Sequence, residues 1–215
     1  MARLAGLYAI TDSQLLPGEK LISGVSAAIA GGARMIQYRE KSADQVHRVR
    51  EATQLRQLCQ RHGITFIIND DAALAAETCA DGVHLGRDDG AIESARQQLP
   101  NGIIGVSCYN DWPRAEMAQA AGADYVAFGA FYPSSTKPNA VAADPSLLTR
   151  AHQTLEIPVV AIGGITAENG ATLINAGADM LAVVQGVFAQ PNIEHAAKQY
   201  AQLFNNSIYT VKDAI

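Results

Sequence analysis

The chain has 215 residues, of which 48% are hydrophobic, and a formal net charge of −5 at pH 7. This size and composition allow one large core, folded either as a single barrel or as two small domains. An acidic balance without a basic cluster argues against a nucleic-acid surface, and no apolar run approaches the ~18 residues that span a bilayer. We therefore expect a soluble cytoplasmic protein without nucleic-acid or membrane partners, and the sequence leaves a homo-oligomer open.

The cysteines and histidines give no sign of a disulfide framework or a zinc site. The cysteines are odd in number and far apart, without a Cys-x-x-Cys pair, and the five histidines show no pair at helical ligand spacing. We interpret Cys59, Cys79 and Cys108 as buried small hydrophobic side chains.

Strand-like and helix-like segments alternate about eight times along the chain. The expected strands are 6–12, 34–41, 65–70, 82–86, 103–108, 125–131, 159–165 and 181–184. The expected helices are 19–30, 42–61, 72–79, 91–99, 112–121, one that begins at Asp144, 167–175 and 193–204. Eight such units without a break in composition predict a single α/β domain over residues 1–215, a closed (β/α)8 TIM barrel, with an open doubly wound sheet as the alternative. The tail 205–215 has no clear pattern.

Local signals support these boundaries. Gly31 and Gly32 are expected to end the first helix, and Ser42 is expected to cap the start of the second. Asp144 followed by Pro145 is typical of a helix start. A similar helix-to-strand joint recurs at Gly32-Ala33, Ala80-Asp81-Gly82, Gly122-Ala123-Asp124 and Gly177-Ala178-Asp179, which indicates that one junction is built several times.

A row of polar side chains ends the second expected strand. Strand residues alternate between faces, so Gln37, Arg39 and Lys41 share one face, while Ile36 and Tyr38 share the other. An amide and two cations that face an enclosed space suit a ligand with several anionic oxygens. A solvated edge strand is the alternative. Polar residues gather at the expected strand ends, where barrel enzymes place their active sites, and this favours a site.

Acidic residues end the third and fourth expected strands. Asp70 closes 65–70 and Asp89 follows 82–86, so a barrel would make them neighbours. Mg²⁺ prefers one or two carboxylates and completes its shell with water and phosphate oxygens. Helix capping is the alternative for Asp71, Asp88 and Asp89, and we favour capping for Asp71 and Asp88.

A second anion site is expected at the last strands. Gly163-Gly164 and Gln185-Gly186 follow the seventh and eighth expected strands, where many barrels bind a phosphate through backbone N–H groups. The irregular segment 132–143 is long enough to form a lid. It adds hydroxyl groups and a cation from Ser134, Ser135, Thr136 and Lys137.

In this order, the motifs resemble those of thiamine-phosphate synthases over residues 6–188. They are 6–12, Gln37-x-Arg39-x-Lys41, Asn69-Asp70-Asp71, Gly82-Val83-His84-Leu85-Gly86 with Asp89, Gly105-Val106-Ser107, 133–137 and Ile162-Gly163-Gly164-Ile165. The resemblance implies a transferase of thiamine biosynthesis. Such an enzyme joins hydroxymethylpyrimidine diphosphate to thiazole monophosphate and releases pyrophosphate with the help of Mg²⁺.

The resemblance also implies a role for each motif residue. The pyrimidine diphosphate would be held by Gln37, Tyr38, Arg39, Glu40, Lys41, Asn69, Ser107 and Lys137. Mg²⁺ would be held by Asp70 and Asp89, and the thiazole phosphate by Ser134, Ser135, Thr136, Gly164, Val184 and Gln185. Arg39, Lys41 and Lys137 would be the catalytic residues that stabilise the departing pyrophosphate. Two positions depart from the family: Gln185 stands where Ser is common, and Arg87 stands where Gln is usual.

The aminopyrimidine can carry positive charge at its methylene carbon, so we hypothesise a dissociative reaction without a protein nucleophile. Cys108 is then a structural thiol. Three other functions stay open: a barrel that binds or tautomerises thiazole phosphate without coupling, a non-catalytic phosphate-binding barrel, and a phosphosugar isomerase or epimerase. The last would need an acid/base pair, for which only Asp12 is available at the mouth. Asp70, Asp89, Arg39 and Lys41 together favour the synthase.

Overall fold

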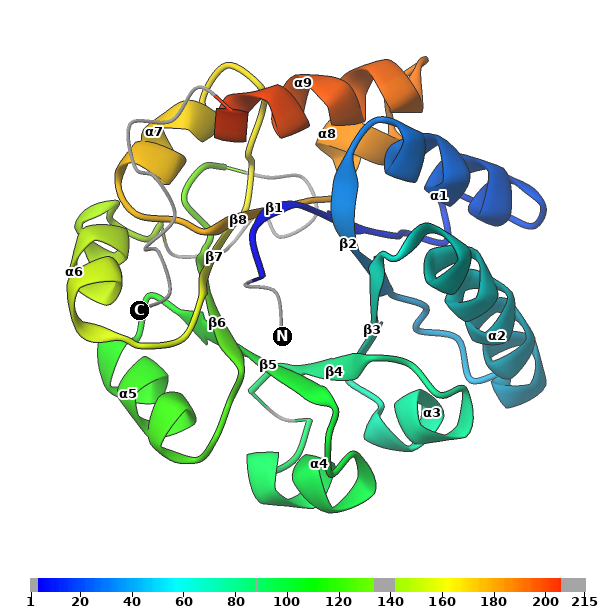
Figure 1. The fold of residues 1–215 in the computed structure, drawn as a ribbon, viewed down its shortest axis with the longest axis horizontal. Helices are drawn as coiled ribbons and strands as arrows, with labels where there is room; N and C mark the ends of the chain where they lie inside the picture. Colours follow the sequence, from blue (N-terminus) through cyan, green and yellow to red (C-terminus); the bar gives the residue numbers. More distant parts are fainter. Residues whose placement is uncertain (1–3, 88, 134–141, 206–215) are drawn as a thin grey trace.

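The computed structural model describes residues 4–87, 89–133 and 142–205. Eight parallel strands close into a barrel in chain order, and helices surround it (Figure 1). The strands are β1 (Gly6–Ile10), β2 (Ala33–Tyr38), β3 (Thr65–Asn69), β4 (Gly82–Leu85), β5 (Ile103–Tyr109), β6 (Tyr125–Gly129), β7 (Val159–Ile162) and β8 (Met180–Val183). The helices are α1 (Lys20–Ala30), α2 (Gln45–His62), α3 (Ala72–Glu77), α4 (Ile92–Gln98), α5 (Trp112–Ala120), α6 (Ser146–Thr154), α7 (Gly170–Asn175), α8 (Gln185–Phe188) and α9 (Ile193–Asn205). Because β8 pairs with β1, the predicted barrel is confirmed and the open sheet is excluded.

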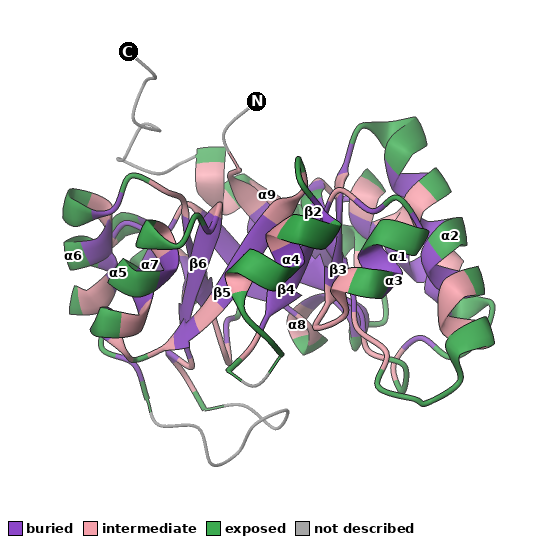
Figure 2. Ribbon diagram, turned by 90° about the horizontal axis from the view of Figure 1, so that it is seen from below, coloured by how far each residue is buried: buried purple, intermediate pink, exposed green. Residues whose placement is uncertain are grey.

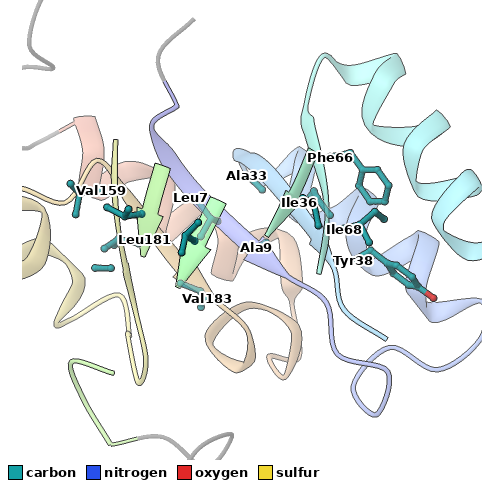
Figure 3. Close-up of a cluster of buried hydrophobic side chains, with 14 of the residues drawn as sticks. Leu7, Ala9, Ala33, Ile36, Tyr38, Phe66, Ile68, Val159, Leu181 and Val183 are labelled. Atoms are coloured by element: carbon teal, nitrogen blue, oxygen red, sulfur yellow. The ribbon is translucent and has the colours of Figure 1, made fainter. Parts of the chain in front are cut away.

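The alternation of strand side chains divides the barrel into two hydrophobic cores. Outward side chains such as Ile36 and Phe66 pack under the helices (Figure 3). Inward side chains such as Met35, Ile67 and Val160 fill the barrel itself. The strands are buried almost throughout, and the helices expose their outer faces (Figure 2). Each fully buried aliphatic or aromatic side chain contributes about 1.5–3 kcal/mol of transfer free energy, so these cores fix the strand order.

Three aspartates connect neighbouring strands at the amino end of the barrel. The residues Asp81, Asp124 and Asp179 stand just before β4, β6 and β8. Each carboxylate accepts a hydrogen bond from a backbone N–H of the preceding strand, at 2.8 Å from Phe66, 2.8 Å from Ile104 and 2.9 Å from Val159. The repeated sequence motif is therefore a structural junction, and it lies at the opposite end from the predicted site.

Several element ends differ from the predictions. The strand β2 ends at Tyr38, before the expected end at 41. The N-cap of α6 is Pro145, one residue after the expected helix start at Asp144, whose carboxylate accepts the Ser146 N–H at 2.7 Å.

Two helices also differ from the predictions. The N-cap of α2 is Asp44, whose carboxylate accepts the His47 N–H at 2.9 Å. The predicted cap, Ser42, lies before the helix, where its own N–H donates to the Glu40 carboxylate at 2.7 Å. The short helix α8 was not predicted, because four residues carry no helical period.

The cysteines follow the sequence interpretation in two cases out of three. Cys59 and Cys108 are buried, as predicted. The prediction that Cys79 is buried was wrong: this residue is exposed in the turn after α3, at a φ of 53°. Among the residues described, no helix is long and apolar enough to cross a membrane.

Candidate active site at the carboxyl ends of the strands

The polar side chains that end β2 face the mouth of the barrel from one side. Gln37 points into the barrel, where its amide nitrogen donates to the Tyr8 hydroxyl at 2.5 Å. The Arg39 guanidinium lies 3.8 Å from the Asp12 carboxylate. The Lys41 ammonium lies 3.6 Å from the Asp70 carboxylate. Gln37 and Tyr38 thus point to opposite sides, as predicted, but β2 ends at Tyr38. Arg39 and Lys41 lie in the segment that follows, where each meets a carboxylate from a neighbouring strand end.

The two intervening residues have different surroundings. Tyr38 points away from the barrel axis (Figure 3) and its hydroxyl donates to the Glu51 carboxylate of α2 at 2.7 Å. Burial, together with that carboxylate, raises the pKa of Tyr38. The structure therefore places the Tyr38 side chain in the outer core and not among the side chains of the mouth. Glu40 is half-buried and lines the cavity described next.

Asp70 and Asp89 come together at the ends of β3 and β4. Burial, and next the nearby Asp89 carboxylate, raise the pKa of Asp70, while Lys41 lowers it. The Asp89 carboxylate also accepts the Gly86 N–H at 2.7 Å, which fixes the turn after β4. Both acids line a cavity of 520 Å³ together with Lys41 and Asn69. Asp70 and Asp89 are therefore neighbours, as the order of the strands around the barrel predicted.

This pair is the part of the described chain best suited to a magnesium ion. Two neighbouring carboxylates supply the oxygen ligands and negative charge that a hard cation prefers, and the pKa of Asp70 is raised first by burial and then by Asp89. Residues 4–87, 89–133 and 142–205 contain no group of three or more His, Cys, Asp or Glu side chains of the kind that forms an all-protein site. The donor set fits an ion that takes its remaining ligands from water and phosphate.

The neighbouring aspartates were expected to cap helices. Asp71 does so, because its carboxylate accepts the Leu74 N–H at 2.8 Å at the start of α3. The same carboxylate pairs with Arg48 at 2.9 Å. Asp88 lies outside the described residues, so its predicted capping role stays a prediction.

A chain of hydrogen bonds crosses the barrel interior below this mouth. From Gln37 it continues through the hydroxyls of Tyr8 and Tyr125, which are 2.9 Å apart. Tyr125 then meets Nδ1 of His84 at 2.9 Å, and Nε2 of His84 meets the Ser107 hydroxyl at 2.8 Å. Burial raises the pKa of both tyrosines. The two predicted ligand contacts, Gln37 and Ser107, are thereby connected through Tyr8, Tyr125 and His84, for which the sequence predicts no role of their own.

The glycines after β7 allow the loops of β6 and β7 to touch. Gly163 and Gly164 have φ values of 101° and 61°, which favour glycine. A Cβ on Gly164 would lie 2.4 Å from the Pro133 carbonyl oxygen, and the Tyr132 N–H donates to the Gly163 carbonyl at 3.1 Å. The predicted phosphate loop therefore contacts Tyr132 and Pro133, which begin the segment predicted to form a lid. The residues Ser134, Ser135, Thr136 and Lys137 lie outside the described part of the chain.

The end of β8 leads directly into the short helix α8. Val184 is the N-cap of α8 and Gln185 is its first residue. Tyr200 of α9 donates its hydroxyl to the Ile165 carbonyl at 3.0 Å, and a Cβ on Gly186 would lie 2.1 Å from that hydroxyl. Tyr200 thus connects the segment after β7 with the start of α8, so the two halves of the predicted phosphate site share one support.

Arg114 of α5 holds the ends of β4 and β5 together. Its Nε donates to the Ser107 carbonyl at 2.7 Å, and its Nη2 donates to the Gly86 carbonyl at 2.8 Å. The sequence does not reveal this role, because nothing local marks a helix arginine as a partner of two distant strands. Arg87, one of the departures from the family, lies with its Cζ 4.8 Å from the ring centroid of Tyr109, in a cation–π contact.

Comparisons with known proteins identify the family to which the chain belongs. The family model described as thiamine monophosphate synthase matches residues 7–187. The thiamine-phosphate synthase of Thioalkalivibrio sulfidiphilus is 54% identical over 203 residues, which cover 94% of this chain and 96% of that protein. The thiamine-phosphate synthase of Nitrosococcus oceani is 51% identical over 202 residues, with 94% and 93% covered.

A solved structure of a similar protein has the same fold over nearly the whole chain. The thiamine phosphate pyrophosphorylase of Pyrococcus furiosus superposes with a TM-score of 0.87 at 33% identity, covering 95% of this chain and 98% of that one. The predicted family, and with it the transferase class, is confirmed by matches that span nearly the whole chain. The chain therefore belongs to the thiamine monophosphate synthase family.

Proposed function

We propose that the chain joins hydroxymethylpyrimidine diphosphate to thiazole monophosphate, forming thiamine phosphate and releasing pyrophosphate. The observation that carries this proposal is the pairing of two different anion sites at one barrel mouth. Cations and carboxylates end β2 to β4, while glycines and a helix start follow β7 and β8. A barrel that only bound thiazole phosphate would have no use for the first site.

The diphosphate end of the first substrate is assigned to Arg39, Lys41 and Asn69. Arg39 and Lys41 lie beside the carboxylates of Asp12 and Asp70, so their charges are already oriented at the mouth. Gln37 and Ser107 lie deeper, on strands β2 and β5, and are assigned to the pyrimidine ring. The family resemblance adds Lys137 to the cations.

Asp70 and Asp89 are proposed to hold Mg²⁺. When bound there, Mg²⁺ would neutralise charge on the diphosphate and on the departing pyrophosphate. Burial, and next the Asp89 carboxylate, raise the pKa of Asp70, and a cation held by both acids would offset these two effects. Asp89 is kept in place by the Gly86 N–H, so the turn after β4 positions the proposed ligand.

The proposed reaction begins when the bond between the pyrimidine methylene carbon and the diphosphate oxygen breaks. Arg39, Lys41 and Lys137 stabilise the negative charge that collects on the leaving oxygens. The thiazole nitrogen then supplies the electron pair for the new carbon–nitrogen bond, so no protein nucleophile takes part. Burial raises the pKa of Cys108 to about 12, and this keeps the nearest thiol protonated and unreactive.

The thiazole phosphate is assigned to the backbone around Gly164, Val184 and Gln185. Close contact with the loop after β6 requires glycine at 164, and Tyr200 supports both parts of this site. The resemblance adds the hydroxyls of Ser134, Ser135 and Thr136. Two further predictions from the sequence, a cytoplasmic location and a homo-oligomer, stay predictions.

Separate KM measurements for the two substrates test these assignments. Arg39→Met or Lys41→Met is expected to raise KM for the pyrimidine diphosphate at least about tenfold, because each change removes a charged hydrogen-bond donor. KM for the thiazole phosphate should stay within about twofold of wild type. Gly164→Ala should instead raise KM for the thiazole phosphate and leave KM for the pyrimidine diphosphate near its wild-type value, because a Cβ would lie 2.4 Å from the Pro133 carbonyl oxygen.

Arg61→Met is the control for Arg39→Met, because Arg61 is exposed in the last turn of α2. It should leave both KM values unchanged. If Arg39→Met and Gly164→Ala raised both KM values equally, the proposal of two separate anion sites would be contradicted.

A further inference from the structure

The hydrogen-bond chain from Gln37 to Ser107 lies inside the barrel with little freedom to move. The Tyr125 ring occupies the space beside Gly105, where a Cβ would lie 1.9 Å from Cζ of the ring. The same ring stacks on His84 with centroids 5.5 Å apart and meets the Tyr8 ring edge-on at 6.0 Å. Packing on three sides holds the hydroxyl of Tyr125 between its two partners.

The protons in the first half of the chain follow from the chemistry of its donors. An amide nitrogen can only donate, so the Tyr8 hydroxyl oxygen accepts from Gln37. A neutral phenol has one proton, and that of Tyr8 is then available for Tyr125. The proton of Tyr125 is in turn available for Nδ1 of His84. Both phenols stay neutral because burial raises their pKa values.

The proton positions in the second half of the hydrogen-bond chain follow from those in the first half. If Nδ1 of His84 accepts from Tyr125, the single proton of the neutral imidazole is on Nε2. Nε2 is 2.8 Å from the Ser107 hydroxyl oxygen and donates to it. Ser107 then accepts from His84, and its own proton is available for donation to a ligand.

We infer that Gln37, Tyr8, Tyr125 and His84 set the polarity of Ser107, so that its hydroxyl donates to the ligand. Tyr8, Tyr125 and His84 are positioning residues in this scheme, because they act through Ser107. A donor at this place selects a ring atom with a lone pair, such as a pyrimidine nitrogen, over a C–H or N–H group. The identity of the ligand rests on the proposed function above, whereas the direction of the hydrogen-bond chain rests on the orientation of the Gln37 amide, whose nitrogen faces Tyr8.

The opposite orientation of the Gln37 amide would reverse every bond. Tyr8 would then donate to the amide oxygen, His84 would carry its proton on Nδ1, and Ser107 would donate to Nε2. Ser107 could then only accept from the ligand. The tautomer of His84 therefore shows in which direction the hydrogen bonds from Gln37 to Ser107 run.

Nitrogen-15 NMR of the imidazole groups measures that tautomer directly. In the wild-type protein we expect the proton of His84 on Nε2, with the signals assigned by their loss in His84→Gln. In Tyr125→Phe the ring stays but the hydroxyl is removed, so His84 should become a mixture of tautomers. KM for the pyrimidine diphosphate should rise about tenfold, the effect of one misdirected hydrogen bond, while KM for the thiazole phosphate stays unchanged.

Thr78→Val is the matched control. Thr78 is buried, and its hydroxyl makes one hydrogen bond to the Leu74 carbonyl at 2.7 Å near the end of α3. Its removal should leave the His84 tautomer and both KM values as in wild type. Tyr8→Phe breaks the chain one step further from the ligand and should also give mixed tautomers, so it replaces Tyr125→Phe if that variant does not fold.

Two results would overturn the inference. One is a wild-type His84 protonated on Nδ1, and the other is an unchanged tautomer in both tyrosine variants. Ser107→Ala separates this inference from the proposed function. If that variant bound the pyrimidine diphosphate as tightly as wild type, the role proposed for Ser107 would be wrong, while the tautomer measurement would still decide the direction of the chain.

Discussion

Individual side chains at the mouth of the barrel are held by partners from neighbouring strands. Lys41 lies 3.6 Å from Asp70, Asp89 accepts the Gly86 N–H, and Ser107 is bonded to His84. Such contacts orient polar groups before a ligand arrives and reduce the entropy cost of binding. At this scale we expect substitutions at the mouth to change catalysis more than the free energy of unfolding.

The buried thiols give a prediction about alkaline stability. Burial raises the pKa of Cys59 and of Cys108 from 9.0 to about 12. Below pH 9 both thiols are neutral in the folded and unfolded states, so they add no pH dependence. Above it the unfolded chain ionises first, and each thiol lowers the free energy of unfolding by about 1.4 kcal/mol per pH unit until its folded pKa is reached.

Urea denaturation between about pH 8 and pH 11 measures this slope. The double variant Cys59→Ala with Cys108→Ala should lose stability less steeply than wild type as the pH rises. Cys79→Ala is the control and should keep the wild-type slope, because Cys79 is exposed. Equal slopes in all three proteins would show that the buried thiols ionise as easily as exposed ones.

Among the secondary-structure elements, α5 has a role in the site that its sequence does not reveal. Arg114 joins the carbonyls of Gly86 and Ser107, so it sets the spacing between the ends of β4 and β5. Asp89 follows β4, and Ser107 lies near the end of β5. A helix on the outside of the barrel thus positions one proposed metal ligand and one proposed contact of the pyrimidine ring.

Arg114→Lys tests this role, because an ammonium cannot reproduce a planar fork that reaches two carbonyls. We expect KM for the pyrimidine diphosphate to rise about tenfold and the free energy of unfolding to fall by about 1–2 kcal/mol. Steady-state kinetics and urea denaturation measure the two effects.

Arg56→Lys is the control at the other end of the barrel. Arg56 donates through Nε to the Cys79 carbonyl at 2.6 Å and pairs with Asp81 at 3.2 Å. The Arg56→Lys variant should lose a similar free energy of unfolding and keep the wild-type KM values for both substrates. If the two variants had the same KM for the pyrimidine diphosphate, the positioning role of Arg114 would be refuted.

In the barrel as a whole, the residues of the proposed site and the aspartate junctions that stabilise the fold lie at opposite ends. The carboxyl ends of all eight strands lie at one edge of the barrel, so the two proposed anion sites share one mouth. The aspartate junctions lie at the amino ends, where Asp81 and Asp124 also pair with Arg56 and Arg96. Substitutions there should destabilise the protein without changing its substrate preference.

The barrel and much of its mouth could be predicted because consecutive strands become neighbours. This rule brought Asp70 and Asp89 together from sequence order alone. The interior chain could not be predicted in the same way, because Tyr8 and Tyr125 are 117 residues apart and meet only across a closed barrel. Polar side chains in mid-strand on the inward face were the available signal. The cap of α2 was misassigned because Ser42 and Asp44 are both good caps, and hydrogen bonding decides between them.

The most direct test of the account follows thiamine phosphate and pyrophosphate from both substrates, with and without Mg²⁺, for wild type, Asp70→Asn and Asp71→Asn. Asp71→Asn is the matched control, since Asp71 caps α3 and asparagine also caps well. We expect both products in equal amounts only when Mg²⁺ is present, a loss of at least about a hundredfold in Asp70→Asn, and near-normal rates in Asp71→Asn. Full activity without Mg²⁺, or in Asp70→Asn, would contradict the account.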